Sequence, residues 1–326
     1  MSKISAFGTV YIMGDIWTKL AKTLFITSGL PLLGLVTMAK PAIAQAIITL
    51  PNGIRCEGQF NGFTGRGICE YPEGYYRGTI VNGQRQGQGV FYFSEGNGGG
   101  DDNLATIYEG QFSNDRPNGR GRFIYGNDDR YDGEVLNGIP HGTGQFTFRS
   151  LETENFLFVV NNNLITMENV DKRDSRYFGG VRNGRPEGRG TFVYGICQAY
   201  GAELRCLRYD GMFRNGVPHG QGTMTTPACL VRGGQVVCSR FTGNFYRGQP
   251  NGPGQIITAN GDRCQGEFND FTFTGRGTCT YTNGDRYSGE LRFGAPHGIG
   301  VATYANGQSY RGEFVFGAPR GISRAR

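Results

Sequence analysis

The chain has 326 residues, of which 56 are glycine and 13% are aromatic. A disordered polymer lacks this many aromatic residues, and an ordinary enzyme does not devote so much of its chain to glycine. The formal net charge is +6, but after the first 46 residues the one lysine is Lys172, and the other cations are arginines scattered along the chain. This scatter argues against a dedicated nucleic-acid-binding stripe, so we expect no nucleic-acid partner.

Residues 1–46 predict a secretory signal peptide. Two lysines precede the apolar run TLFITSGLPLLGLVTMA, which is followed by KPAIAQA with small residues at alternate positions. Cleavage after Ala44 or Ala46 would remove four lysines and one aspartate and lower the formal net charge from +6 to +3. An uncleaved membrane anchor is the alternative, because the apolar run is not much shorter than the roughly 20 residues that a span needs. The small-x-small pattern favours cleavage, so we expect an exported protein, periplasmic or extracellular.

A single array over residues 47–326 repeats one pattern from Cys56 to Arg320. Tyrosine or a substitute opens each unit, glycine stands third, an apolar residue fifth, and glycines return twelfth and fourteenth. The clearest copies are YEGQFSNDRPNGRGRFIY from Tyr108, YDGEVLNGIPHGTGQFTF from Tyr131, YFGGVRNGRPEGRGTFVY from Tyr177 and YSGELRFGAPHGIGVATY from Tyr287. Other copies start at Cys56, Tyr76, Tyr209, Phe241 and Cys264, and a truncated copy starts at Tyr310.

The spacing of the units shows where residues are inserted. Four intervals between unit starts are 23 residues long, and three intervals of 32 residues contain nine extra residues. The interval from Tyr131 to Tyr177 is 46 residues, twice the basic period. Residues 150–176 therefore predict either a degenerate repeat that has lost its glycines or an inserted surface loop.

Within a unit the patterned positions fall two apart, which predicts β-strands. The dipeptide NG lies between the halves of a unit, and NGD or GND lies between units; these residues tolerate the positive φ of tight turns. Each unit is thus predicted to be a β-hairpin, with successive hairpins paired edge to edge in an antiparallel meander. Glycine in these strands leaves a slot in which a neighbouring tyrosine or phenylalanine ring can lie.

The pattern Y-x-G-x-F-x-x-G-x-x-x-G-x-G-x-F-x-Y resembles the MORN (membrane occupation and recognition nexus) repeat, and about ten units cover nearly all of the chain after the leader. The resemblance implies an all-β fold, an elongated twisted single-layer antiparallel sheet with one aromatic face. MORN arrays also occur as appendages of phosphatidylinositol phosphate kinases and of some methyltransferases. Here the array leaves no room for a catalytic domain of about 100 residues, so a kinase-like name would rest on similarity only.

Eight cysteines form four local pairs in the repeat frame: Cys56 with Cys69, Cys197 with Cys206, Cys229 with Cys238, and Cys264 with Cys279. The first and last pairs stand where aromatic residues would face each other across a hairpin, and the other two bracket most of the nine-residue insertions. An even number of cysteines behind an export signal predicts disulfides. A four-cysteine zinc site would usually need two close C-x2-C pairs, which are absent.

Catalytic and metal-binding patterns are absent from the array. The three histidines occupy the same PHG turn, where other units carry glutamate or asparagine, so their place predicts a structural role rather than a general base. The GQG and GRG pieces open strands, whereas nucleotide-binding loops open helices. The acidic run at residues 95–103 lacks the ligand spacing of a calcium loop and is predicted to be a turn. We expect no catalytic residue, no metal and no cofactor.

The sequence therefore predicts a non-enzymatic binding or scaffold protein of the cell envelope, as is usual for repeat arrays without a reaction centre. Its expected partners are an envelope protein, a membrane surface or a glycan, and the unpaired strand edges at the sheet ends predict a homo-oligomer. The opening tyrosines are expected to pack over glycines. A subset of them, with the histidines, is the candidate binding surface: Tyr76, Tyr108, Tyr131, Tyr177, Tyr209, Tyr287, Tyr310, His141, His219 and His297.

Overall fold

The computed structural model describes residues 45–94, 105–149, 153–160, 163–171, 174–269 and 274–320. Residues 1–44 of the predicted leader (residues 1–46) lie outside these ranges, as does the acidic run at 95–103. The proposed cleavage position Ala44 is therefore not described, whereas the other one, Ala46, is. Every regular element in the described ranges is a β-strand.

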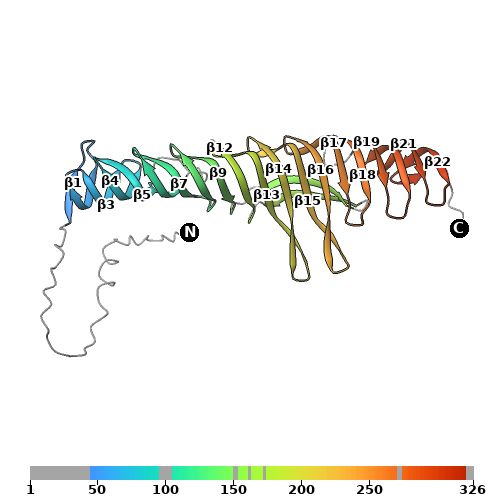
Figure 1. Ribbon diagram of the computed structural model, residues 1–326, viewed down its shortest axis with the longest axis horizontal. Helices are drawn as coiled ribbons and strands as arrows, with labels where there is room; N and C mark the ends of the chain where they lie inside the picture. Colours follow the sequence, from blue (N-terminus) through green and yellow to red (C-terminus); the bar gives the residue numbers. More distant parts are fainter. Residues whose placement is uncertain are drawn as a thin grey trace, which may run out of the picture. The chain divides into compact units, whose positions relative to one another are not determined.

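Twenty-one of the strands form one open antiparallel sheet in which neighbouring strands follow chain order, with β12 next to β9 (Figure 1). This confirms the predicted all-β meander. The strands of the first half are β1 (Ala46–Thr49), β2 (Arg55–Asn61), β3 (Thr64–Tyr71), β4 (Gly74–Val81), β5 (Gln84–Phe93), β6 (Ala105–Ser113), β7 (Arg116–Tyr125), β8 (Arg130–Leu136) and β9 (Ile139–Thr147). The others are β12 (Arg176–Arg182), β13 (Arg185–Tyr200), β14 (Glu203–Arg214), β15 (Val217–Arg232), β16 (Gln235–Tyr246), β17 (Gln249–Ile257), β18 (Arg263–Phe268), β19 (Gly275–Thr280), β20 (Arg286–Arg292), β21 (Ala295–Thr303), β22 (Ser309–Val315) and β23 (Ala318–Pro319).

The segment between the units that open at Tyr131 and Tyr177 forms a hairpin of its own. Strands β10 (Thr153–Val160) and β11 (Asn163–Asp171) pair only with each other as a two-stranded sheet. Strand β9 pairs directly with β12, and Phe146 lies opposite Tyr177. The hairpin is therefore inserted between two strands that are neighbours in the large sheet, and the repeat continues across it without a gap.

The tight turns within the units follow from their Asn-Gly sequences. Asn82 and Gly83 have φ angles of 50° and 82°, and Asn137 and Gly138 have φ angles of 50° and 85°. Two successive residues with positive φ make the type I′ turn that matches the twist of a two-stranded hairpin. Asparagine and glycine tolerate this conformation, so the local sequence fixes where the strands of these units reverse. In three later units the same place is taken by Arg247, Phe293 and Phe316, which have φ angles of 50°, 53° and 46°.

A row of glycines crosses the large sheet, one from every strand from β2 to β22, with each glycine opposite the next. Its members are Gly58, Gly67, Gly78, Gly89, Gly110, Gly121, Gly133, Gly144, Gly179, Gly190, Gly211, Gly222, Gly243, Gly254, Gly266, Gly277, Gly289, Gly300 and Gly312. The opening ring of a unit lies over two of them: a Cβ atom on Gly89 would lie 2.5 Å from the Tyr76 hydroxyl oxygen. The predicted packing of rings over glycines is confirmed.

The core of the protein consists of these rings on one face of the sheet, which we call the buried face. The opening tyrosines of five units have no exposed surface. Four of them contact phenylalanines edge to face, as with Tyr76 and Phe112 at 4.9 Å between ring centroids, and Tyr131 has a tilted contact with Phe146. Such edge-to-face pairs add to the free energy gained by burying the rings.

A β-bulge explains why most units open with tyrosine rather than phenylalanine. In the pairing of β8 with β9 the register shifts between Gly133 and Val135, and the Tyr131 hydroxyl donates a hydrogen bond to the carbonyl oxygen of Glu134 at 2.7 Å. Equivalent hydroxyl-to-carbonyl bonds are made by Tyr76, Tyr108, Tyr177, Tyr209, Tyr287 and Tyr310. The hydroxyl thus satisfies a carbonyl at the irregular part of the ladder, where leaving it unpaired would cost free energy.

Candidate functional site

The opening tyrosines form the core and present almost no accessible surface. Tyr76, Tyr108, Tyr131, Tyr177 and Tyr209 have 0% exposure and Tyr287 has 3%, whereas Tyr310, in the truncated last unit, is only partly buried. Burial raises the pKa of Tyr76, Tyr108, Tyr177 and Tyr209 to about 12. These fully buried rings therefore offer no contact surface to a ligand, in contrast to the outward face of the sheet.

The histidines lie at hairpin ends where neighbouring units contact each other. At the same place in other units, the side chains of Gln86, Asn118 and Glu187 each accept a hydrogen bond from a backbone N–H in the turn of the next unit. His219 instead packs against Tyr246, with 5.5 Å between ring centroids, and His297 packs against Phe316, with 5.2 Å. The third, His141, uses its carbonyl oxygen to accept a bond from the Tyr131 hydroxyl at 3.2 Å. The contacts of His219 and His297 join successive hairpins, whereas the bond to His141 lies within one hairpin.

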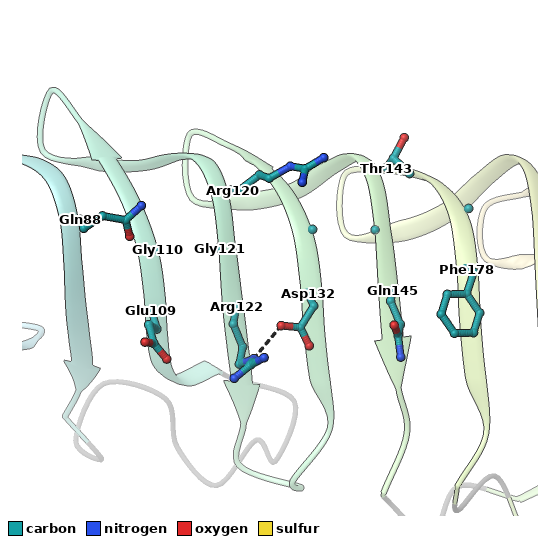
Figure 2. A pocket seen from close by; sticks show the side chains of 13 residues that line it. Gln88, Glu109, Gly110, Arg120, Gly121, Arg122, Asp132, Thr143, Gln145 and Phe178 are labelled. Atoms are coloured by element: carbon teal, nitrogen blue, oxygen red, sulfur yellow. Dashed lines mark hydrogen bonds and ion pairs between the residues drawn. The ribbon is translucent and has the colours of Figure 1, made fainter.

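The outward face carries a groove floored by the glycine row. Side chains alternate between faces along a strand, so the residues on either side of each row glycine point outward. Figure 2 shows these residues as two walls, with Gln88, Arg120 and Thr143 on one side, and on the other Glu109, Arg122, Asp132, Gln145 and Phe178. The groove over strands β5 to β12 has a volume of about 650 Å³.

The wall that contains Phe178 changes character along the sheet. Toward the N-terminus it carries charged and apolar residues, including the ion pair between Arg122 Nε and Asp132 Oδ1 at 2.6 Å. Beyond Phe178 almost all of its residues are hydroxyl or amide side chains, each opposite the next; we call this part the hydroxyl row. It consists of Thr191, Asp210, Thr223, Thr242, Gln255, Gln265, Thr278 and Ser288.

Asp210 is the one ionisable member of the hydroxyl row. Burial opposes its ionisation, but hydrogen bonds from Arg208 and Thr191 outweigh this effect and lower the pKa of its carboxyl group. The Thr191 hydroxyl donates to Asp210 at 2.7 Å, and the hydroxyls of Thr223 and Thr242 lie 3.0 Å apart. The row is thus a ladder of polar side chains that can exchange hydrogen bonds with a ligand.

Exposed apolar side chains gather on the outward face near the N-terminal end of the sheet. Tyr75 and Tyr92 are opposite each other in β4 and β5 and are 54% and 44% exposed. Ile68 on the adjacent strand β3 is 45% exposed. We call these three residues the apolar patch; exposed aromatic residues of this kind are typical of protein-binding surfaces.

All four predicted cysteine pairs are disulfides. Cys56 and Cys69 are fully buried, whereas Cys197 is exposed on one of two long hairpins, β13–β14 and β15–β16, which extend beyond the other turns (Figure 1). The Tyr200 hydroxyl joins these hairpins by donating to the carbonyl oxygen of Pro227 at 2.7 Å. Four disulfides are consistent with a periplasmic or extracellular location.

The described part of the chain contains no cluster of three or more histidine, cysteine, aspartate or glutamate side chains that could hold a metal ion. None of its elements is a helix long and apolar enough to cross a membrane. Residues 1–44 of the proposed signal peptide or anchor, and the acidic run at 95–103, lie outside the described residues.

A single open sheet built from β-hairpins in a common register, with one face of rings over glycines, defines a β-repeat protein. The sequence model of the MORN repeat matches eight segments: residues 76–98, 108–130, 131–151, 177–196, 209–227, 241–263, 264–286 and 287–309. The chain belongs to the MORN repeat family. The search of curated proteins found no match. Two further units of the same register lie outside the eight matched segments. They are the hairpin β2–β3, which opens at Cys56, and the truncated unit at Tyr310.

Proposed function

We propose that this protein is a non-enzymatic binding scaffold of the cell envelope that holds a protein partner against its outward face. The observation that carries the proposal is the contrast between the two faces. The buried face repeats the same rings and glycines in unit after unit, whereas the outward face differs from strand to strand. Packing does not require the outward residues, so they are available for recognition.

The apolar patch and the groove support a protein partner. The patch supplies exposed aromatic rings, and the groove continues from it over strands β5 to β12. An extended segment lying across the strands would contact backbone at the glycine floor and side chains at both walls. The four disulfides and the predicted export signal support the envelope location.

Photo-crosslinking in intact cells tests the proposal. A photoreactive amino acid at position 178 replaces the exposed Phe178 in the groove wall, and one at position 306 replaces Asn306 in an exposed turn away from the groove. We expect a discrete protein adduct from position 178 and none from position 306. Absence of a protein adduct at position 178 would overturn the proposal. ATP turnover above background by the purified chain would overturn the statement that the protein is non-enzymatic.

A membrane surface is the second candidate, favoured by the exposed arginines of the outward face. It predicts that the protein sediments with vesicles of anionic lipid at low salt and is released at high salt, because salt screens attraction between exposed charges. No sedimentation at low salt would remove this candidate.

A further inference from the structure

Six arginines that are scattered in the sequence lie on one line across the strands of the sheet. Each immediately precedes the opening residue of a unit, and each lies two strands from the next, on β8, β12, β14, β16, β18 and β20. We call this line the arginine row; its members are Arg130, Arg176, Arg208, Arg240, Arg263 and Arg286. The strands between them contribute Thr147, Val193, Thr225, Ile257 and Thr280 to the same line.

The arginine row points outward. Each arginine is next to a residue of the buried face, such as Tyr131 or Tyr209, and alternation along the strand puts its side chain on the opposite face. All six arginines are exposed. Two strand spacings of about 4.8 Å separate neighbouring arginines, so the charges recur about every 10 Å over about 48 Å of sheet.

Most of these charges have no partner within the protein. Arg208 pairs with Asp210, with 2.6 Å between Nε and Oδ2, but the other five form no ion pair with any described residue. Aspartates precede three of the arginines in sequence, at Asp129, Asp262 and Asp285. Each of their carboxylates accepts a hydrogen bond from a backbone N–H in the next turn, with N to Oδ1 distances of 2.6, 2.9 and 2.8 Å. The guanidinium groups therefore remain available to an external anion.

The hydroxyl row runs beside the arginine row on the same face. Four of the arginines lie two residues before a member of the hydroxyl row on the same strand, and so point to the same side as that member: Arg208, Arg240, Arg263 and Arg286. The first two arginines, Arg130 and Arg176, lie two residues before Asp132 and Phe178 instead. Phe178, 44% exposed, stands two residues from Arg176 at the start of this region. A ligand along the arginine row would thus meet a line of cations, a parallel line of hydrogen-bonding groups and one exposed ring.

We propose that the arginine row and the hydroxyl row together bind a linear acidic polysaccharide that carries one carboxylate or sulfate per disaccharide. One sugar residue of an extended chain is about as long as one strand spacing, so one anionic group per disaccharide matches one arginine per two strands. The sugar hydroxyls exchange hydrogen bonds with the hydroxyl row, and an apolar sugar face stacks on Phe178. This inference rests on the outward face being the binding face.

The spacing of the arginines along the row argues against a nucleic acid or a membrane surface as the ligand. Phosphates in a nucleic-acid duplex follow one another at about 3.4 Å along each strand, so a row with one arginine per 10 Å would leave most of them unpaired. A membrane presents a two-dimensional field of headgroups, and a single line of arginines would use little of it. A polysaccharide chain is itself one-dimensional and carries its own hydrogen-bonding groups.

Titration of the full-length, disulfide-bonded protein with hyaluronate oligosaccharides, which carry one carboxylate per disaccharide, tests the proposal by calorimetry. We expect binding that strengthens with length up to about ten sugars, the number of strand spacings that the row covers, and that weakens with salt. Neutral dextran should not bind. The variant R240Q/R263Q should bind at least about tenfold more weakly, because it removes two unpaired cations from the row.

The matched control is R66Q/R77Q, which removes two exposed arginines from the outward face at the N-terminal end, outside the row. We expect it to bind hyaluronate within about twofold of the unaltered protein, and both variants to keep the melting temperature. Equal losses in the two variants, no binding to hyaluronate, or tighter binding to anionic vesicles or single-stranded DNA than to hyaluronate would each overturn the inference. A protein adduct at position 178 together with no polysaccharide binding would leave the scaffold proposal standing and remove this one.

Discussion

The N-terminal strands β2 to β7 and the strands from β8 to β20 have the same buried face but different outward faces. Both regions pack tyrosine or phenylalanine rings over the glycine row. On the outward face, the line of residues that precede the opening aromatics carries Tyr75 and Tyr92 in the first region and the arginine row in the second. In a single-layer sheet, packing constrains one face only, so one scaffold can carry surfaces of different chemistry in succession.

Alkaline pH should produce the largest effect, and it tests whether the two regions share one core. Burial raises the pKa of Tyr76 and Tyr108 in the first region, and of Tyr177 and Tyr209 in the second, to about 12 from an ordinary value of 10.0. Between these values the unfolded chain releases protons that the folded chain retains, so the free energy of unfolding falls as pH rises. We expect the free energy of unfolding to keep its full value below pH 10. Before pH 12 the spectroscopic signal of the strands should be lost in one cooperative transition, and the absorbance of phenolate should appear in the same transition. Two separate transitions would show that the regions unfold independently.

Valine in the glycine row should destabilise both regions alike. A Cβ on Gly89 would lie 2.7 Å from Tyr76 Cζ, and one on Gly222 would lie 2.5 Å from Tyr209 Cζ. We expect Gly89→Val and Gly222→Val each to lower the free energy of unfolding by about 3 kcal/mol, because the ring must leave its place. Gln88→Val, on the outward face beside Gly89, is the control and should cost less than about 0.5 kcal/mol in chemical denaturation. A large loss in one region alone would contradict the shared core.

Removal of a disulfide should cost less, and its cost should depend on where the pair lies. Replacement of the buried Cys56 and Cys69 by alanine is expected to lower the free energy of unfolding by about 2–3 kcal/mol, since it frees a short loop in the unfolded chain. Cys197 is exposed on a hairpin that extends beyond the sheet, so a mild reductant should open the Cys197–Cys206 bond first. Alkylation of the released thiols followed by mass spectrometry gives the order in which the disulfides are reduced. Earlier labelling of Cys56 would contradict the structure.

Loss of one tyrosine hydroxyl should have the smallest effect. Tyr131→Phe keeps the ring but leaves the carbonyl of Glu134 without the hydroxyl's 2.7 Å hydrogen bond, which should cost about 1–2 kcal/mol. Tyr75→Phe, on the outward face and 54% exposed, is the matched control and should be within about 0.5 kcal/mol of the unaltered protein. Equal costs at the two positions would mean that the bulge carbonyl finds another partner.

Much of the buried face could be predicted from the sequence because its causes are local. Asn-Gly pairs fix the turns of several units, the alternation of residues along the chain predicts the strands, and the repeat frame places Cys264 opposite Cys279. The role of the tyrosine hydroxyl escaped prediction, because the bulge between Gly133 and Val135 leaves no distinct mark in the sequence. The same tyrosines were candidates for the binding surface, whereas in the structure the ring that packs over glycine is covered by its neighbours.

The sequence by itself determined the repeat, the hairpins, the disulfide pairs and the face that is buried, since each depends on residues within one unit or the next. Only the tertiary structure decided which outward residues share a line. Arg130 and Arg176 are 46 residues apart and Arg263 and Arg286 are 23 apart, yet each pair is separated by two strands. The reason is that β10–β11 and the long hairpins take the inserted residues out of the sheet, so strand register aligns side chains that the sequence spaces unevenly.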